Sequence, residues 1–154
     1  MTNNDILRRL RYALELDDAT LVRLFASRGV EADEGQVRSW MLRQDEAGSV
    51  PLEDEEFEAL LDALIIGRRG PPPEGSKPPP PTPLTNNSVL KKLRIALSLR
   101  NTDMLDIVAL GGRSLSKAEL GALMRPPGHR HYRACGDQLM RAFLAGLTKR
   151  ERPT

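Results

Sequence analysis

The residues best suited to chemistry gather in one short segment, residues 125–147, RPPGHRHYRACGDQLMRAFLAGL. Four side chains that can donate to a metal fall within nine residues there: His129, His131, Cys135 and Asp137. Zinc accepts such a mixed set, but structural zinc sites usually take their donors from two separated elements. Donors on one short loop that enters a helix do not converge easily on a tetrahedral ion. We therefore expect no metal and no cofactor at this segment.

A cysteine nucleophile is the other chemical interpretation of the segment. Cys135 lies near an expected helix start and four residues after His131, and a helix dipole with a nearby imidazolium can lower a thiol pKa. No oxyanion hole or pocket can be argued from the sequence, and a small buried thiol explains the same residue. The chain also contains no glycine-rich phosphate loop and no nucleotide fingerprint. We expect a protein that is not an enzyme, with a thiol- or metal-dependent activity at Cys135 as the open alternative.

The composition limits which elements can position this segment. The 154 residues are 40% apolar and 29% charged but only 4% aromatic, which is typical of a folded protein with an aliphatic core. No apolar run approaches the roughly 18 residues that span a bilayer. The N-terminus lacks the pattern of a secretory signal, and a single cysteine allows no internal disulfide. These features predict a cytoplasmic protein that does not bind membranes.

The chain repeats itself at a distance of 83 residues. LRRLRYALEL (7–16) aligns with LKKLRIALSL (90–99), and eleven of the forty pairs that start at residues 3–42 are identical. The spacing holds without a gap to the end of the unit, which indicates a tandem duplication. Equivalent apolar residues should then be buried in both copies, Leu10 as Leu93 and Leu64 as Leu147.

Apolar residues recur at helical spacing four times in each copy. We expect the first helix at about 4–16, capped by Asn3 or Asn4, and the second after Asp17, ending at Gly29. No stretch alternates with β-branched residues. The predicted fold is all-α, with two tandem four-helix repeats.

A proline-rich linker separates the two copies. Residues 67–83 contain eight of the twelve prolines and three glycines, a composition that favours extended polyproline II structure. The predicted organisation is an acidic helical repeat at 1–66, a linker at 67–84 and a basic helical repeat at 85–150. A semi-rigid spacer is favoured over a docking site for an SH3-like or WW-like domain.

The two copies carry opposite charge. Residues 1–66 hold seven arginines against fifteen carboxylates, a net charge of −8, and residues 85–154 hold thirteen basic residues against five acids, a net charge of +8. The copies could attract each other, the basic copy could face a polyanion, or the charges could have drifted after duplication. The second and third helices of each copy also have a helix-turn-helix-like arrangement, although their connection is long for that motif.

Several segments resemble the YehS-like bacterial proteins, a family with a domain of unknown function that occurs as a tandem repeat. They are NNDILRRLRYALELDD, QVRSWM, LTNNSVLKKLRIALSL and HYRACGDQLMRAFLAGL. The resemblance implies a small, duplicated, helical, cytoplasmic protein and supplies no catalytic residues.

The function that we expect is non-catalytic binding of a macromolecule, most simply a protein, by a monomer or weak dimer. The alternative is a nucleic-acid-binding regulator that uses basic residues of the second copy, with Arg100 and Lys117 among them, against phosphates. Cys135 should be buried, while His131, Tyr132 and Arg133 should face outward. The candidate binding residues are His129, His131, Tyr132, Arg133, Gln138, Lys91, Lys92, Arg94, Arg130 and Arg141.

Overall fold

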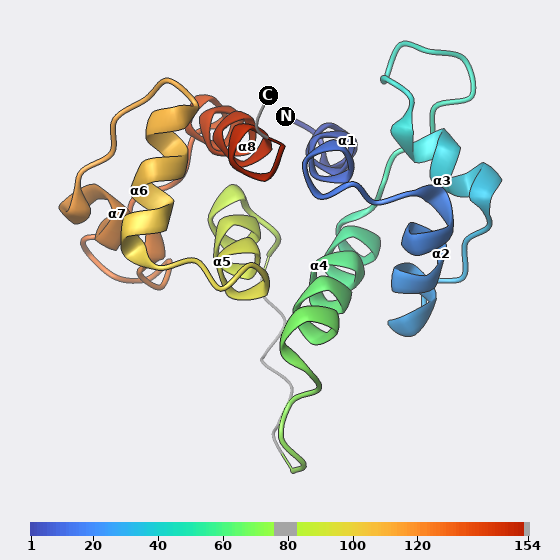
Figure 1. Cartoon of the computed structure of the whole chain (residues 1–154), viewed down its shortest axis with the longest axis horizontal. Coiled ribbons are helices and arrows are strands. Elements are labelled where there is room, and N and C mark those ends of the chain that lie inside the picture. The colour runs from blue at the N-terminus through green and yellow to red at the C-terminus, as the bar shows by residue number, and fades with distance from the viewer. Residues whose placement is uncertain (76–82, 153–154) are drawn as a thin grey trace.

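The computed structural model describes residues 1–75 and 83–152, and within these it contains eight α-helices and no strand (Figure 1). We call the first four helices repeat 1 and the last four repeat 2. The all-α tandem fold is therefore confirmed, while part of the predicted polyproline linker, residues 76–82, lies outside the described residues. The helices are α1 (Asn3–Leu14), α2 (Asp18–Ser27), α3 (Glu34–Met41), α4 (Asp54–Arg69), α5 (Asn86–Ala96), α6 (Asn101–Leu110), α7 (Lys117–Met124) and α8 (Asp137–Glu151).

Equivalent positions of the two repeats have the same structure. Helices α2 and α6, like α3 and α7, begin and end 83 residues apart. Leu10 and Leu93 are fully buried, and Leu64 and Leu147 are 4% and 0% exposed. The expected burial of both copies of each leucine is thus confirmed. Matching burial follows because each four-helix unit buries the same apolar stripe.

The first helix of each repeat begins with a threonine cap. The Thr2 hydroxyl accepts from the Asp5 amide at 3.1 Å, and Thr85 caps Ser88 in the same way at 3.2 Å. The expectation that Asn3 or Asn4 caps α1 was wrong, since both lie inside the helix. Threonine also satisfies orphan amides, which leaves the asparagine side chains free for other bonds.

The two repeats pack crosswise. Helix α1 of repeat 1 packs against α8 of repeat 2, and α4 of repeat 1 packs against α5 of repeat 2 (Figure 1). Under the 83-residue shift α1 corresponds to α5 and α4 to α8, so these two contacts are equivalent. The repeats are therefore related by an approximate two-fold axis, as the subunits of a symmetric dimer would be.

Opposite charges meet between the repeats. Lys92 Nζ lies 2.5 Å from Asp62 Oδ1, with the two side chains 21% and 30% exposed. The amino group of Met1 lies 2.8 Å from Asp137 Oδ2. The Lys92–Asp62 pair is consistent with attraction between the acidic and basic copies, whereas the Met1–Asp137 pair joins a cation of the acidic copy to an acid of the basic copy. Only part of each net charge lies at this interface.

Repeat 2 is more tightly packed than repeat 1 at one place. A Cβ atom added to Gly146 would lie 1.7 Å from Ile107 O, and one added to Gly111 would lie 1.8 Å from Ala142 O. Helices α6 and α8 therefore approach through glycine backbones. The equivalent residues of repeat 1 are Arg28 and Ala63, whose side chains exclude the same close approach between α2 and α4.

Candidate functional site: a cleft between the repeats

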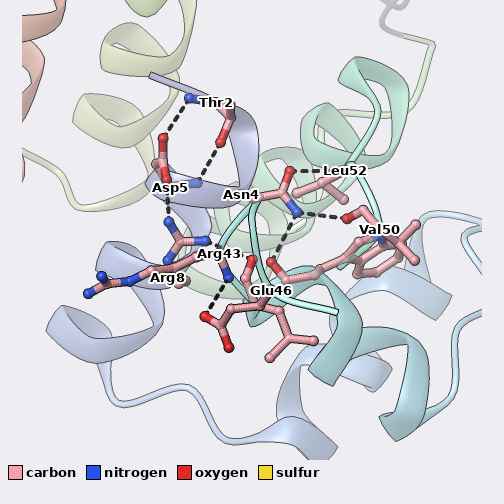
Figure 2. A network of polar contacts seen from close by, with 10 residues as sticks. Thr2, Asn4, Asp5, Arg8, Arg43, Glu46, Val50 and Leu52 are labelled. Atoms are coloured by element: carbon pink, nitrogen blue, oxygen red, sulfur yellow. Dashed lines mark hydrogen bonds and ion pairs between the residues drawn. The ribbon is translucent and has the colours of Figure 1, made fainter. Parts of the chain in front are cut away.

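A buried asparagine organises each repeat. The Asn4 carboxamide donates to Trp40 O at 3.0 Å and to Val50 O at 2.9 Å, and it accepts from the Leu52 amide at 2.9 Å (Figure 2). The side chain ties helix α1 to the end of α3 and to the loop that leads into α4. Asn4 is only 8% exposed, so water cannot reach these groups. Without the Asn4 side chain, its three partners would be left without a hydrogen bond.

Repeat 2 contains the same arrangement. Asn87 donates to Leu123 O at 3.1 Å and to Arg133 O at 2.8 Å, and it accepts from the Cys135 amide at 2.8 Å. Cys135 therefore occupies the position of Leu52: its backbone amide donates to the asparagine, and its side chain lies in the core.

The neighbouring asparagines hold the starts of α4 and α8. Asn3 Nδ2 donates to Leu52 O at 3.1 Å and to Asp54 Oδ1 at 2.8 Å. Asn86 Nδ2 makes the equivalent bonds to Cys135 O at 3.0 Å and to Asp137 Oδ1 at 2.9 Å. The Oδ1 atoms of Asn3 and Asn86 accept no hydrogen bond from residues 1–75 and 83–152, so they remain available as acceptors.

A cleft of about 520 Å³ lies where the two repeats meet, and we call it the inter-repeat cleft. Four two-fold equivalent pairs contribute to its wall: Met1 with Leu84, Thr2 with Thr85, Asn3 with Asn86, and Ile6 with Val89. Repeat 1 adds the side of the cleft formed by Asn4, Gln44, Ser49, Pro51, Leu52 and Asp54. Since both repeats are needed to form this wall, the cleft exists only when they are packed together.

The lining of the cleft is suited to recognition. Its floor is apolar, from Ile6, Leu52 and Val89, and its polar groups are mainly carboxamides and hydroxyls. Its one acidic side chain, Asp54, already accepts from Asn3. Apolar surface beside hydrogen-bond acceptors complements apolar groups and N–H donors.

The predicted histidine segment lies on the loop between α7 and α8, away from this cleft. His129 and His131 are exposed, with ring centroids 5.6 Å apart, and Arg130 Nε donates to His131 Nε2 at 3.0 Å. Tyr132 is half-buried. In the described ranges, 1–75 and 83–152, no three histidine, cysteine or acidic side chains are grouped so as to hold a metal ion.

Two other predicted residues, Arg133 and Gln138, form bonds within repeat 2. Arg133 is exposed and pairs with Glu119 at 2.9 Å. Gln138 accepts from Arg113 at 3.0 Å. Arg141 is exposed on α8 and has no ion-pair partner among the described residues. None of these residues lines the inter-repeat cleft.

The basic residues of α5 are engaged in the fold. Lys91 Nζ donates to Arg125 O at the end of α7, at 3.2 Å. Lys92 pairs with Asp62 across the repeats, and Arg94 Nε donates to Leu99 O at 3.2 Å. Arg8 is the repeat 1 counterpart of Lys91 and donates to a carbonyl at the end of α3. Figure 2 shows Arg8 beside Asp5. These cations cap helix ends or join the repeats.

Cys135 is buried, as predicted, with 6% exposure. Burial, with a smaller effect of the nearby Asp137 carboxylate, raises the pKa of its thiol from 9.0 to about 11, while Arg133 opposes the change. The thiol donates to Gly136 O at 3.6 Å. A protonated thiol in the core supports the structural interpretation of this residue.

The cleft was missed because its residues carry no chemical signature in the sequence. Threonine, asparagine and isoleucine near a helix start suggest capping and core positions. One pattern could have indicated it, since Thr2, Asn3 and Asn4 recur as Thr85, Asn86 and Asn87. A repeated polar triplet indicates a structural role in both copies. It does not indicate a cleft, because the two triplets come together only through the packing of the repeats.

Fold and cleft together define a class of protein: a duplicated all-α protein whose two repeats form one pseudo-symmetric body. In the part of the chain that the structure describes, no helix is long and apolar enough to cross a bilayer. Residues 3–70 and 86–152 each match the family model described as "Protein of unknown function (DUF1456)", and the chain belongs to this family.

The comparison with curated proteins agrees with this assignment. The chain is 40% identical over 151 residues to the "Uncharacterized protein YehS" of Escherichia coli (strain K12), in an alignment that covers 98% of this chain and 97% of that protein. The predicted resemblance to the YehS-like family is thereby confirmed. No solved structure matches the chain significantly.

Proposed function

We propose that this chain is a non-catalytic binding module that holds a segment of a partner protein in the inter-repeat cleft. The observation that carries the proposal is the lining of the cleft by two-fold equivalent residues from both repeats. Asn3 and Asn86 line the cleft, and their carboxamide oxygens accept no hydrogen bond from the described residues, so they can accept from N–H donors. A partner segment with apolar side chains and exposed backbone amides has matching chemistry.

A protein partner is favoured over nucleic acid by what the basic residues do. Of the cations considered for phosphate binding, Lys92, Arg100 and Arg133 are in ion pairs. Lys91 and Arg94 donate to backbone carbonyls. Phosphate-driven affinity needs several free cations on one face, whereas Lys91, Lys92, Arg100 and Arg133 have internal partners, and Arg94 has its Nε bound to a backbone carbonyl. A cytoplasmic location belongs to the same proposal and is supported by the single unpaired cysteine.

Capture with full-length protein and two matched tryptophan variants tests the proposal. Ser49→Trp places a bulky side chain in the cleft, whereas Ser114→Trp places one on the exposed α6–α7 loop. We expect the native protein and Ser114→Trp to capture the same protein from lysate, and Ser49→Trp to lose it at an unchanged melting temperature. Retention of that protein by Ser49→Trp would overturn the proposal, as would a captured set that disappears after nuclease treatment.

A further inference from the structure

Repeat 2 contains a second concave site, between α5, α6 and α7, which we call the α5–α7 groove. Its volume is about 380 Å³. The groove is separate from the inter-repeat cleft and shares no lining residue with it. Its lining consists of Arg94, Asn101, Thr102, Lys117, Leu120, Gly121 and Met124.

In repeat 1 the equivalent positions carry their own carboxylate. Asp18 Oδ1 accepts from Arg11 Nη2 at 2.8 Å, and Asp18 Oδ2 lies 3.9 Å from Arg38 Nη1. Arg38 also lies 3.9 Å from Glu34. This cluster balances the charge of Arg11, and the Asp18 side chain is only 24% exposed.

In repeat 2 the arginine is kept, but its anionic partner and the neighbouring Glu34–Arg38 pair are replaced. Arg94 occupies the position of Arg11, and its Nε is held by Leu99 O at 3.2 Å as Arg11 Nε is held by Leu16 O at 3.0 Å. Three replacements surround it: Asn101 stands for Asp18, Lys117 for Glu34 and Gly121 for Arg38.

These replacements leave positive charge without a counter-ion. Neither Arg94 nor Lys117 forms an ion pair with any residue of the described ranges, 1–75 and 83–152. Gly121 also has no side chain where repeat 1 has Arg38, and the buried Leu120 and half-buried Met124 line the same groove. The groove therefore combines two cations with an apolar floor.

We propose that the α5–α7 groove binds a carboxylate of a partner protein, presented by an acidic side chain next to an apolar one. Asp18 in repeat 1 shows which group satisfies this arginine when the fold supplies it. A guanidinium binds a carboxylate with paired, charge-assisted hydrogen bonds, and Lys117 adds a second cation. A phosphate backbone has no apolar groups to pack on the apolar floor, so the groove favours a peptide over nucleic acid.

Binding of short peptides to the full chain, followed by NMR chemical shifts, tests this site. The probes are acetyl-Ala-Leu-Asp-Leu-Ala-amide and the same peptide with asparagine in place of aspartate. We expect the acidic peptide to shift amides of α5–α7 residues and the asparagine peptide to bind at least tenfold more weakly. Equal binding of both peptides would overturn the proposal, and so would shifts from a single-stranded oligonucleotide but not from the acidic peptide.

Variants that restore the repeat 1 residues give the decisive comparison. Asn101→Asp rebuilds the internal carboxylate at the first residue of α6, where an acid also suits the helix dipole, so stability should not fall. We expect Asn101→Asp and Lys117→Glu each to weaken binding of the acidic peptide at least tenfold, and the control Arg141→Ala to leave it unchanged. Unchanged binding in both groove variants would refute the proposal. Ser49→Trp should retain this binding, so the groove and the cleft can fail separately.

Discussion

Arg69 and Arg152, 83 positions apart, each donate across the repeat interface to the first helix of the opposite repeat. Arg69 Nη1 lies 3.4 Å from Ile95 O, and Arg152 Nη1 lies 3.0 Å from Tyr12 O. The two acceptors are themselves equivalent residues. This reciprocal pair shows the approximate two-fold axis at the level of single atoms.

The Arg152 half of this pair has additional contacts. Its guanidinium lies 4.2 Å from the centre of the Tyr12 ring and 3.8 Å from the Glu15 carboxylate. Arg69 has Ile95 in place of the ring, and its Nη1 donates to the Ser98 hydroxyl at 3.2 Å. We therefore expect Arg152→Ala to lower the free energy of unfolding by about 1 kcal/mol and Arg69→Ala by less. Urea unfolding of both variants measures the difference, and equal losses would show that the ring contact adds nothing.

The buried asparagines should be among the most sensitive positions. Removing the carboxamide of Asn4 or Asn87 leaves one amide and two carbonyls without their partner in the core. We expect Asn4→Ala and Asn87→Ala each to cost about 3 kcal/mol, measured by denaturant unfolding. Asn3→Ala, at a half-buried position with two bonds, serves as control and should cost clearly less. Similar losses at Asn3 and Asn4 would contradict the importance given to burial.

The close contact of α6 with α8 depends on glycine. Gly146→Ala introduces the residue that repeat 1 has at this position, yet its Cβ would lie 1.7 Å from Ile107 O. We expect a loss of about 1–3 kcal/mol from the backbone shift this forces. Gly121→Ala in α7, where no atom lies within 4 Å of the added Cβ, should instead stabilise by about 0.5–1 kcal/mol. Thermal unfolding distinguishes the two, and a stabilised Gly146→Ala would contradict the packing.

The Cys135 thiol should react slowly in the folded protein. A rise of its pKa from 9.0 to about 11 lowers the thiolate fraction at pH 8 about a hundredfold. We expect alkylation by iodoacetamide to be at least that much slower in the native state than in urea, as followed by mass spectrometry. A native rate close to that of the unfolded chain would show an accessible thiolate.

Glu119 should make stability depend on acid pH. Hydrogen bonds from Ser116, and then the Arg133 guanidinium, hold the pKa of this carboxyl below its ordinary value of 4.5. A lowered folded-state pKa adds stability that is present above pH 4.5 and disappears as pH falls through the lowered value. The melting temperatures of native protein and Glu119→Gln should therefore differ at pH 7 and converge as the pH falls below 4.5 and through the lowered pKa. A constant difference across this range would assign the effect to another group.

The repeats could be predicted because their evidence is periodic. The burial of Leu10 and Leu93 follows from helical spacing, and the Asp17 cap of α2 follows from capping chemistry. The structure has both as expected. Thr2 was overlooked as a cap because Asn3 and Asn4 are equally good capping residues. The structure shows why Asn4 is not the cap: its side chain donates instead to Trp40 O and to Val50 O, in the loop before α4.

The cleft and the groove could not be predicted, for a different reason. The cleft arises from the crosswise packing of α1 with α8 and α4 with α5, and no local pattern specifies that choice. The groove depends on the replacement of Asp18 by Asn101. The sequence does not show that Asp18 pairs with Arg11, so it does not reveal that the equivalent Arg94 lacks an anionic partner. The histidine segment, which looked most chemical in the sequence, lies instead on an exposed loop.

The crosswise pairing has a consequence for how the two halves can evolve. In a homodimer of identical single repeats every substitution appears on both sides of the axis, so a subunit of charge −8 or +8 would meet its own sign. Joining the halves in one chain lets each accept mutations alone. The tether also makes their association unimolecular, at an effective concentration that no dilution lowers. Covalent linkage thus permits one half to become acidic and the other basic while the crosswise contacts are kept.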